Sequence, residues 1–327
     1  MTVKRTARKS GAQSRRIARK TGAQTARTAR NAATPVKRNA SIGKLVIFGV
    51  GLIGGSFALA LKQKRAVGRV VGVGRSRANL LAARRLGIID EIAIDVAAAV
   101  RDADLVLLAV PLAQNAAVLA QIAPHLGPHT IVTDAGSTKQ DVIAQARRHL
   151  GAHFSRFVPA HPIAGTEKSG AKAAFAGLFH AHELIITPEP ETAARAVAKV
   201  AAAWRLAGMQ INRMDAAAHD RMFALVSHLP HVVAYALVGQ VAAYRDARSL
   251  FAHTGGGFRD TTRIAGSSPE MWRDVCLSNR DALLQALDDY LAEFERLRGM
   301  LAANDGAGLE ARFTSARAAR ARWLKRK

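Results

Sequence analysis

Four short polar clusters in the sequence carry side chains that can move protons or bind anions. In sequence letters they are DAGSTK (134–139), HPIAGTEKSG (161–170), SHLPH (227–231) and GGGFRDTTR (255–263). The imidazole of His161 has an ordinary pKa of about 6.5, which suits general-base catalysis near neutral pH. The planar guanidinium groups of Arg259 and Arg263 match the geometry of carboxylates. The clusters therefore predict a base beside a clamp for an anionic substrate.

The first three clusters also have a structural interpretation. Ser137 can cap the next helix, contact a ligand, or do both. A histidine such as His161 is often a hydrogen-bonded structural residue when it stands alone. Ser227 and His231 are four residues apart, so they share one face if the segment is helical, and His228 then faces another direction. We therefore expect Ser227 and His231, rather than His228, to line a site.

The glycine-rich cluster is open to two interpretations as well. Three consecutive glycines let the backbone at Gly256 approach a ligand closely. The alternative is a flexible loop between helices, with Arg259 and Arg263 in solvent. Taken with a cofactor site, the first interpretation predicts a dehydrogenase that acts on an anionic substrate.

A glycine-rich turn earlier in the chain, with the spacing G-x-G-x-x-G, predicts that cofactor site. It follows the apolar run 44–48 and opens onto an Ala- and Leu-rich stretch. The first glycine permits a tight turn, the second lets a pyrophosphate approach, and the third lets the helix pack on the strand. Free N–H groups at the helix start then face the phosphates. The alternative is an ordinary strand–helix turn without a ligand.

The remaining cofactor contacts are expected at the ends of neighbouring strands. A second β-like run, 69–74, stands where the fingerprint expects the ribose-binding strand, and the strand near 104–110 ends at Pro111. Loops at the carboxyl ends of parallel strands line the ligand crevice. The residues expected to contact the dinucleotide, NAD or NADP, are Gly49, Gly51, Leu52, Ile53, Gly54, Arg75, Ser76, Val110 and Pro111.

Short apolar strands alternate with helices through the first two thirds of the chain. Strands are expected near 44–50, 69–74, 104–110, 130–134, 156–160 and 183–187, and helices near 54–64, 77–86, 113–125, 138–149 and 191–206. Continuously apolar strands are typical of a parallel sheet covered on both faces. The pattern predicts an α/β fold with a Rossmann-type, doubly wound, mostly parallel sheet. His161 then stands at the carboxyl end of the strand expected near 156–160.

Strand signals end near residue 215, and long Ala- and Leu-rich helices follow. We expect them at 215–250, 269–303 and 307–324, with Ser268 as an N-cap before Pro269. Long helices with wide apolar faces usually need a partner, so an all-helical dimerisation domain and a homodimer are expected. The expected domains are a disordered basic arm (1–41), an NAD(P)-binding Rossmann domain (42–208), and a helical dimerisation and substrate domain with a basic tail (209–327).

Positive charge is concentrated at the two ends of the chain. The formal net charge is +24; residues 1–40 hold twelve Lys or Arg, residues 312–327 hold seven more, and neither segment holds an acid. The arm is a solvated tail, a nucleic-acid-binding arm that acts by neutralising phosphates, or an organelle transit peptide. Since the middle of the chain is nearly balanced, we expect a small-molecule substrate and no nucleic-acid contact beyond the arm.

Composition limits the class of protein. A hydrophobic content of 49% indicates a globular chain. No apolar run approaches the roughly 18–20 residues that span a bilayer, so no membrane contact is expected. The single cysteine, Cys276, is expected to pack as a small apolar residue, and one cysteine fits a reducing, cytoplasmic setting. No metal site is expected.

Together the clusters resemble the prephenate dehydrogenase family, which includes arogenate and cyclohexadienyl dehydrogenases. The matching stretches are GVGLIGGSFALALK, DLVLLAVP, DAGSTK, HPIAGTEKSG, SHLPH and GGGFRDTTRIAGSSPEMWRDV, in the family's order, within residues 43–300. The resemblance implies oxidative decarboxylation of prephenate to 4-hydroxyphenylpyruvate in tyrosine biosynthesis, with a nicotinamide cofactor taking the hydride. It also implies an NAD(P)-binding domain followed by a helical domain that forms a dimer.

The resemblance assigns roles to individual residues. His161 matches the family histidine that polarises the ring hydroxyl, and Ser137 supports it. Arg263 matches the arginine that grips a substrate carboxylate. Ser227 and His231 match residues that line the substrate site. Glu167 matches an acidic position near the substrate side chain, and the glycine cluster adds Gly256 to the residues expected at the substrate.

One stretch departs from the pattern of NAD-preferring domains. Such domains end the second strand with an Asp or Glu that binds the ribose 2′-OH. This chain has Gly74-Arg75-Ser76-Arg77 there, so no carboxylate repels a 2′-phosphate and Arg75, Ser76 or Arg77 can hold one. We therefore expect NADP to be accepted alongside NAD.

Other functions fit parts of the sequence. Within the family, an arogenate or broad-specificity cyclohexadienyl dehydrogenase is the alternative. A β-hydroxyacid-type dehydrogenase would need a lysine base on a helix, and no lysine stands in a convincing setting. A nucleic-acid-binding or regulatory protein with a non-catalytic Rossmann domain would use the basic arm; the settings of His161 and Arg263 favour an enzyme instead.

Overall fold

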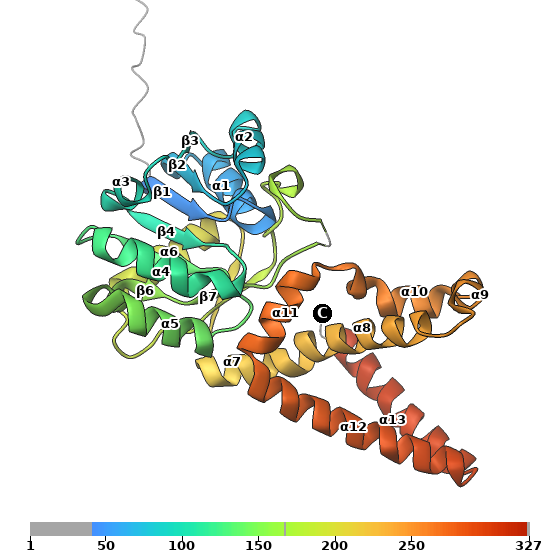
Figure 1. Cartoon of the computed structure of the whole chain (residues 1–327). Helices are drawn as coiled ribbons and strands as arrows, with labels where there is room; N and C mark the ends of the chain where they lie inside the picture. The colour runs from blue at the N-terminus through green and yellow to red at the C-terminus, as the bar shows by residue number, and fades with distance from the viewer. Residues whose placement is uncertain (1–40, 167, 326–327) are drawn as a thin grey trace, which may run out of the picture. The chain divides into compact units, whose positions relative to one another are not determined.

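The computed structural model describes residues 41–166 and 168–325 (Figure 1). The expected basic arm, apart from Ser41, and the candidate site residue Glu167 lie outside these ranges. The first part of the described chain is built on a six-stranded parallel sheet in the order β3-β2-β1-β4-β5-β6. This is the strand order of a doubly wound dinucleotide-binding sheet, so the predicted fold class is confirmed.

Helices cover both faces of this sheet, which explains why its strands are apolar throughout. The strands are β1 (Ile42–Phe48), β2 (Val67–Val73), β3 (Glu91–Ile92), β4 (Leu105–Leu108), β5 (Ile131–Asp134) and β6 (Phe157–Val158). The helices are α1 (Leu52–Gln63), α2 (Arg77–Arg85), α3 (Val96–Arg101), α4 (Asn115–Ile122), α5 (Gln140–Leu150) and α6 (Ala194–Leu206). The core on one face includes α1, α2 and α6, and that on the other includes α3, α4 and α5.

The strand predicted near 156–160 is two strands of different sheets. β6 ends the large sheet, and after Pro159 the strand β7 (Ala160–Pro162) pairs antiparallel with β8 (Glu183–Ile186). Proline has no N–H to donate to a strand ladder, so the large sheet stops there. His161 therefore lies inside β7, opposite Ile185, and not at the carboxyl end of the strand predicted near 156–160.

The strand β9 (Gln210–Arg213), which pairs parallel with β8, follows the expected domain boundary. It carries strand structure to Arg213, and the boundary between residues 208 and 209 stays a prediction. Within the described ranges, every later element is helical.

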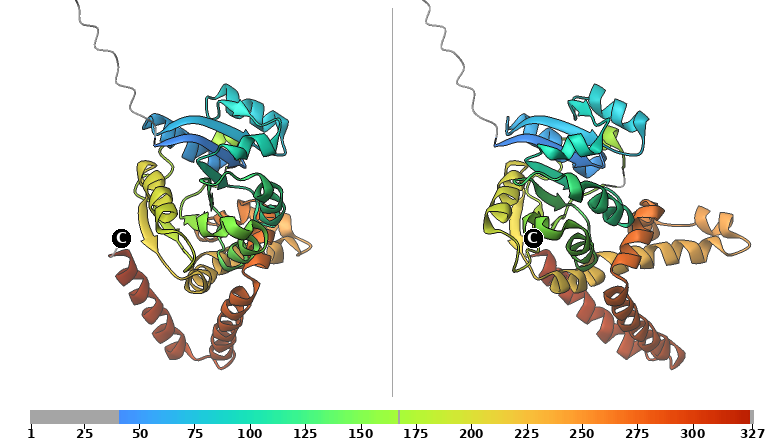
Figure 2. Two further views of the ribbon diagram at one scale, coloured as in Figure 1. Left: turned by 90° about the vertical axis from the view of Figure 1, so that its left-hand side faces the viewer. Right: turned by 60° about the vertical axis from the view of Figure 1, so that its left-hand side comes forward.

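The helical part is more interrupted than its sequence suggests. Its elements are α7 (Ala216–Phe223), the π-helical turn η5 (Ala224–His228), α8 (Leu229–Ala242), α9 (Ala247–Ala252), α10 (Gly256–Thr262), the 3₁₀ turn η6 (Arg263–Gly266), α11 (Pro269–Ser278), α12 (Arg280–Ala302) and α13 (Gly306–Leu324). The Ser268 hydroxyl caps α11 by accepting the Met271 N–H, as predicted. α12 and α13 form a hairpin, joined by an ion pair between Glu293 and Arg312 (Figure 1, Figure 2).

One helical run, Ala216–Ala242, is long and apolar enough to cross a bilayer, judged by length and composition alone. This corrects the expectation that no apolar stretch approaches that length. The run joins α7, η5 and α8, and only 28% of its most apolar window is buried within the chain. Its buried side carries polar residues such as His219 and His228, whereas Leu225 and Val226 are exposed. Such an apolar outer side is typical of a helix at a subunit interface.

The glycine turn between β1 and α1 has the geometry that its spacing predicts. Gly49 has a φ of +90°, and a Cβ there would lie 2.2 Å from the Ala109 carbonyl oxygen. A Cβ on Gly54 would lie 2.5 Å from the Gly49 carbonyl oxygen, so α1 packs directly on the turn. Nothing lies within 4 Å of the Cβ position of Gly51. Open space is therefore left at the N-terminus of α1.

We expect Gly49→Ala to lower the free energy of unfolding by about 3 kcal/mol, because the new Cβ meets backbone and the left-handed conformation becomes strained. Gly51→Ala is the matched control, and its unfolding free energy should stay within about 0.5 kcal/mol of the wild type. Urea denaturation measures both values. Equal stability of the two variants would contradict this account of the turn.

Candidate active site

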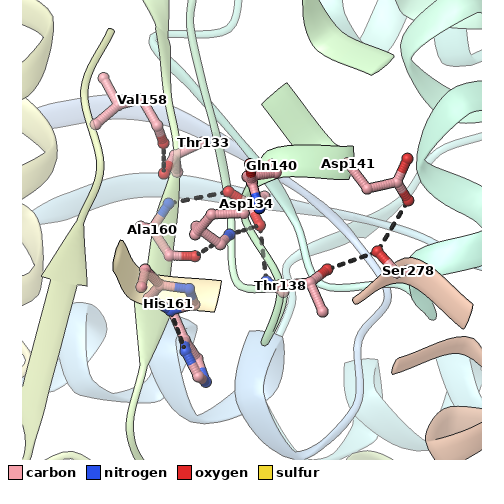
Figure 3. Close-up of polar contacts among 12 residues, drawn as sticks. Thr133, Asp134, Thr138, Gln140, Asp141, Val158, Ala160, His161 and Ser278 are labelled. Atoms are coloured by element: carbon pink, nitrogen blue, oxygen red, sulfur yellow. Dashed lines mark hydrogen bonds and ion pairs between the residues drawn. The ribbon is translucent and has the colours of Figure 1, made fainter. Parts of the chain in front are cut away.

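A buried ion pair fixes the backbone that leads into His161. The ammonium group of Lys139 and the carboxylate of Asp134 are in contact, and both side chains are fully buried. Lys139 Nζ also donates to the Ala160 carbonyl at 2.8 Å, while the Ala160 N–H donates to Asp134 Oδ1 at 2.9 Å. Figure 3 shows Asp134 between Ala160 and the segment that leads to Thr138. The end of β5 is thereby tied to the start of β7.

His161 is one of three side chains joined in series by hydrogen bonds. His161 Nδ1 lies 2.9 Å from His219 Nε2, and His219 Nδ1 lies 2.8 Å from Asp220 Oδ1. The Phe223 ring packs on both imidazoles, with centroid distances of 4.7 Å to His161 and 4.5 Å to His219. α7 of the helical part therefore supplies the immediate surroundings of a residue on β7.

The surroundings of these histidines favour the neutral imidazole. Burial, reinforced by the nearby His219, Lys139 and His228, lowers the pKa of His161 well below 6.5. Burial also lowers the pKa of His219, although Asp220 opposes the shift. For His228, burial lowers the pKa to about 4. A neutral imidazole can accept a proton, so His161 is competent as a base at neutral pH.

The helix after Ser137 is capped from the other domain. α5 begins at Gln140, and the N–H groups of Lys139 and Gln140 each donate to the Asp220 carboxylate at 2.8 Å. The suggestion that Ser137 caps this helix is therefore wrong. Ser137 is half-buried, and its backbone faces His228 closely enough to raise the pKa of that imidazole against the effect of burial.

His231 and Arg263 are neighbours within the helical part. Burial lowers the pKa of His231 to about 4, and the Arg263 charge contributes to the shift. The His231 ring stacks on Trp272 with centroids 3.5 Å apart, and its buried Nδ1 has no hydrogen-bond partner within the described ranges. His228 lies 6.0 Å from the Trp272 ring and interacts electrostatically with both His161 and His231. The expectation that His228 faces away from the site is therefore wrong.

A π-helical turn explains the position of His228. The turn η5 contains Ser227 and His228, so the spacing of an ordinary α-helix does not apply there. Asn279, at the junction of α11 and α12, donates to the Asp220 carbonyl at 2.8 Å, and its amide nitrogen lies 3.1 Å from His228 Nδ1. Ser227 is half-buried on the same turn. π-turns inside α-helices are frequent at functional sites.

The expected cofactor residues gather around the glycine turn. The first turn of α1 has neither a side-chain cap nor an acidic residue, so its N–H groups are available to an anion. A Cβ on Gly49 would lie 2.9 Å from the Val110 nitrogen, which places the end of β4 against the turn. These features fit a dinucleotide pyrophosphate. The residues brought together here are Gly49, Gly51, Leu52, Ile53, Gly54, Val110 and Pro111.

Arg75 and Ser76 follow β2, and their side chains make different contacts. The Ser76 hydroxyl accepts the Asn79 N–H at 3.2 Å and caps α2. Arg75 is exposed, with a guanidinium nitrogen 3.5 Å from a carboxylate oxygen of Glu270 on α11. Asn79 also donates to the Val50 carbonyl in the glycine turn at 2.8 Å. Asn79 therefore supports the cofactor edge, although the sequence patterns did not select it.

Two expected residues do not join the His161 group directly. Arg263 is exposed and is linked to it through His231 and His228. Gly256 is exposed at the start of α10, which packs along α8 (Figure 1). In residues 41–166 and 168–325, no group of His, Cys, Asp or Glu is arranged to hold a metal ion.

Several buried polar residues of the site were not foreseen, and they are Asp134, Lys139, His219, Asp220, His228 and Asn279. Asp134, Lys139 and His228 stand inside the clusters DAGSTK and SHLPH but were not selected as site residues, and the adjacent pair His219-Asp220 is visible as polar residues inside an Ala-rich helix. Charged residues are rarely buried unless they are paired. Once the helix is known to be buried, such a polar pair therefore indicates hydrogen bonds to other buried polar groups.

Comparison with known proteins agrees with this arrangement. The family described as prephenate dehydrogenase, nucleotide-binding domain, matches residues 57–213, and the prephenate dehydrogenase dimerization domain matches residues 215–315. A cyclohexadienyl dehydrogenase of Zymomonas mobilis is 41% identical over 84% of this chain and 94% of its own length. A prephenate dehydrogenase of Bacillus subtilis is 36% identical over 84% of this chain and 74% of its own.

Solved structures give the same result. Prephenate dehydrogenase from A. aeolicus, in complex with hydroxyphenyl propionate and NAD+, matches with a TM-score of 0.80 and 33% identity, covering 86% of this chain and 99% of that one. Synechocystis arogenate dehydrogenase matches with a TM-score of 0.71 and 28% identity over the same shares of the two chains. The chain belongs to the prephenate dehydrogenase family, with a nucleotide-binding domain followed by a dimerization domain.

Proposed function

We propose that this chain catalyses the NAD+-dependent oxidative decarboxylation of prephenate to 4-hydroxyphenylpyruvate in tyrosine biosynthesis. The observation that carries the proposal is the buried, neutral His161, hydrogen-bonded at Nδ1 to His219 and set beside the His228–His231–Arg263 group. A base and a cation so placed suit a substrate with a ring hydroxyl and carboxylates. The family membership and the NAD+ complex of the A. aeolicus relative support the same chemistry.

When bound, NAD+ would accept, as hydride, the hydrogen of the ring carbon that bears the hydroxyl, together with both electrons of that C–H bond. His161 Nε2 accepts a hydrogen bond from the ring hydroxyl and takes up its proton as the hydroxyl carbon gains carbonyl character. The C–C bond to the ring carboxylate breaks, carbon dioxide leaves, and its electron pair makes the ring aromatic. The proton then returns from His161 to the oxygen, which becomes the phenol. The imidazole needs to hold that proton only while the positive charge on the substrate carbon develops.

Electrostatics of the site suit a dianion. Arg263 supplies a full positive charge for the side-chain carboxylate, and Ser227 and His231 add hydrogen-bonding groups beside it. Lys139 does not compete for the substrate, because it is buried against Asp134. Glu167 and Gly256 remain candidates for contact with the substrate side chain.

Arogenate is the second candidate substrate. Arogenate differs from prephenate by one amino group, and the 41% identical relative is named cyclohexadienyl dehydrogenase. Absorbance of the reduced nicotinamide, with prephenate or arogenate and NAD+ or NADP+, decides between the substrates. Turnover of neither substrate with either cofactor would overturn the proposed function.

A homodimer is the expected assembly. The dimerization-domain match covers the run Ala216–Ala242, whose outer side is apolar, and α12 exposes Leu284, Leu291 and Leu301. A second copy of the chain would cover these surfaces. Half-buried Cys276, whose thiol pKa is raised by burial, fits the proposed cytoplasmic setting, and no membrane or nucleic-acid partner is needed for the reaction.

The first prediction concerns His161. His161→Gln should lower kcat by about 10²–10⁴-fold, the usual contribution of a general base. In the unchanged enzyme the base must be unprotonated, so kcat/KM falls as pH drops through the pKa of His161. Burial lowers that pKa well below 6.5, which places the acidic limb of the pH profile below 6.5. Steady-state kinetics measure the profile, and an acidic limb at or above 6.5 would count against the assignment.

A second prediction concerns the carboxylate clamp. Arg263→Ala should raise the KM for prephenate by roughly 10–100-fold and change that for NAD+ by less than about 2-fold, because a charge-assisted pair with the substrate is lost. Arg259→Ala, at an exposed arginine on the preceding helix, is the matched control and should leave both values near wild type. If the two variants behave alike, Arg263 is not the clamp.

A third prediction concerns NADP, which we propose is accepted through Arg75. Arg75→Ala should weaken NADP+ by about 10-fold or more and leave NAD+ nearly unchanged, since only the former carries a 2′-phosphate. Glu270→Gln removes the carboxylate that now pairs with Arg75, so NADP+ should bind more tightly. The KM values of both cofactors give the answer. Equal effects of Arg75→Ala on the two cofactors would refute the role.

A further inference from the structure

The series Asp220–His219–His161 determines where each shared proton lies. Although burial opposes it, hydrogen bonds from His219 and from the Gln140 and Lys139 N–H groups lower the pKa of Asp220. An ionised carboxylate only accepts hydrogen bonds, so His219 Nδ1 carries the proton in the 2.8 Å contact.

The same reasoning continues to the second imidazole. A neutral histidine has one N–H, so with its proton on Nδ1 the Nε2 of His219 is an acceptor. His161 Nδ1, which lies 2.9 Å from that nitrogen, must then donate. The remaining nitrogen of His161, Nε2, is left with a free lone pair.

The surrounding charges keep both rings neutral in the resting enzyme. His161 faces His219 on α7, Lys139 before α5 and His228 on η5. His219 faces Asp220 on its own helix, and Lys139 and Asp134 across the domain junction. Lys139 is buried and positively charged through its pair with Asp134, so a second buried cation beside it is disfavoured. The proton order derived above therefore applies without an imidazolium.

We propose that His219 and Asp220 are positioning residues that hold His161 in the one neutral tautomer able to take a proton through Nε2. Asp220 sets the tautomer of His219, and His219 sets that of His161. A carboxylate that holds an imidazole in the correct tautomer is a known device in enzymes, and here a second imidazole lies between the two. The catalytic meaning rests on the proposed function, whereas the tautomer is a property of the free enzyme.

His219 gives a cleaner test than Asp220, because Asp220 also caps α5 and its loss would disturb the fold. His219→Ala removes the acceptor of the His161 Nδ1–H. His219→Gln can present an amide oxygen near the former Nε2 position, so it retains an acceptor but cannot titrate. His180→Gln makes the same chemical change at an exposed site and is the matched control.

The first measurement is the ¹⁵N spectrum of the ligand-free enzyme labelled at histidine, with resonances assigned by their loss in the His161→Gln and His219→Gln variants. We expect His161 and His219 each to carry the proton on Nδ1. In His219→Ala, His161 should become a mixture of both neutral tautomers. A proton on Nε2 of His161 in the unchanged enzyme would overturn the inference, whatever the substrate is.

The second measurement is the pH profile of prephenate turnover. His219→Ala should lower kcat by about 10²-fold with the KM for prephenate changed less than about 3-fold, and His219→Gln should recover much of the loss. In His219→Gln the acidic limb should move to higher pH, since a ring that helps to lower the pKa of His161 is gone. His180→Gln should match the unchanged enzyme.

The outcomes separate this inference from the proposed function. A lower melting temperature with an unmoved pH limb and no recovery in His219→Gln would show a merely structural role and overturn the inference alone. Absence of turnover in the unchanged enzyme, with the expected tautomers present in the spectrum, would instead overturn the proposed function.

Discussion

The ionised carboxylate of Asp220 is the constraint on which the rest of the site depends. It is buried in the helical part, yet two of its three N–H donors begin a helix of the Rossmann part, and the third is the His219 ring. A buried charge is tolerated only when its hydrogen bonds are complete, so these bonds hold the two parts of the site in one arrangement. The position of His161 relative to α7 follows from that requirement.

A second buried charge, that of Lys139, fixes the backbone next to His161. Lys139 is fully buried and contacts Asp134 and the Ala160 carbonyl, which fixes the backbone just before the histidine. Burial lowers the pKa of this lysine, and the Asp134 charge opposes the shift. The imidazole is thus fixed from its backbone by one ion pair and from its ring by His219. Little freedom of movement is therefore left for Nε2, the other ring nitrogen of His161.

Much of the fold could be predicted because local pattern and tertiary structure agree there. The glycine turn needs three different backbone properties at Gly49, Gly51 and Gly54, and such requirements leave a visible spacing. The strand order follows from apolar strands alternating with helices. The switch from β6 to β7 could not be predicted from apolar pattern, because both strands are short and apolar residues continue from one into the other. The break between them depends on the missing N–H of Pro159.

The site itself could be predicted only in part. His161 and Arg263 stand in recognisable sequence stretches. The partners of His161 come from a helix in which the adjacent polar pair His219-Asp220 is visible, but the sequence does not show that this pair is buried. His219 and Asp220 meet His161 across 58 and more residues of chain, so no local spacing connects them. His228 was misplaced because an argument from 3.6 residues per turn assumes an unbroken α-helix, and η5 is not one.

The π-helical turn η5 also restricts which changes of chain length this segment can accept. Removing one residue between Ala224 and His228 would let the run close into an uninterrupted α-helix, which is locally more favourable. A π-turn holds about one residue more than the 3.6 residues of an α-turn, so the shortened chain would keep the direction in which α8 faces and would change the directions of the side chains within η5. Point substitutions can be absorbed one side chain at a time, whereas a codon lost here would displace Ser227 and His228 together while the apolar outer side of α8 stayed in place.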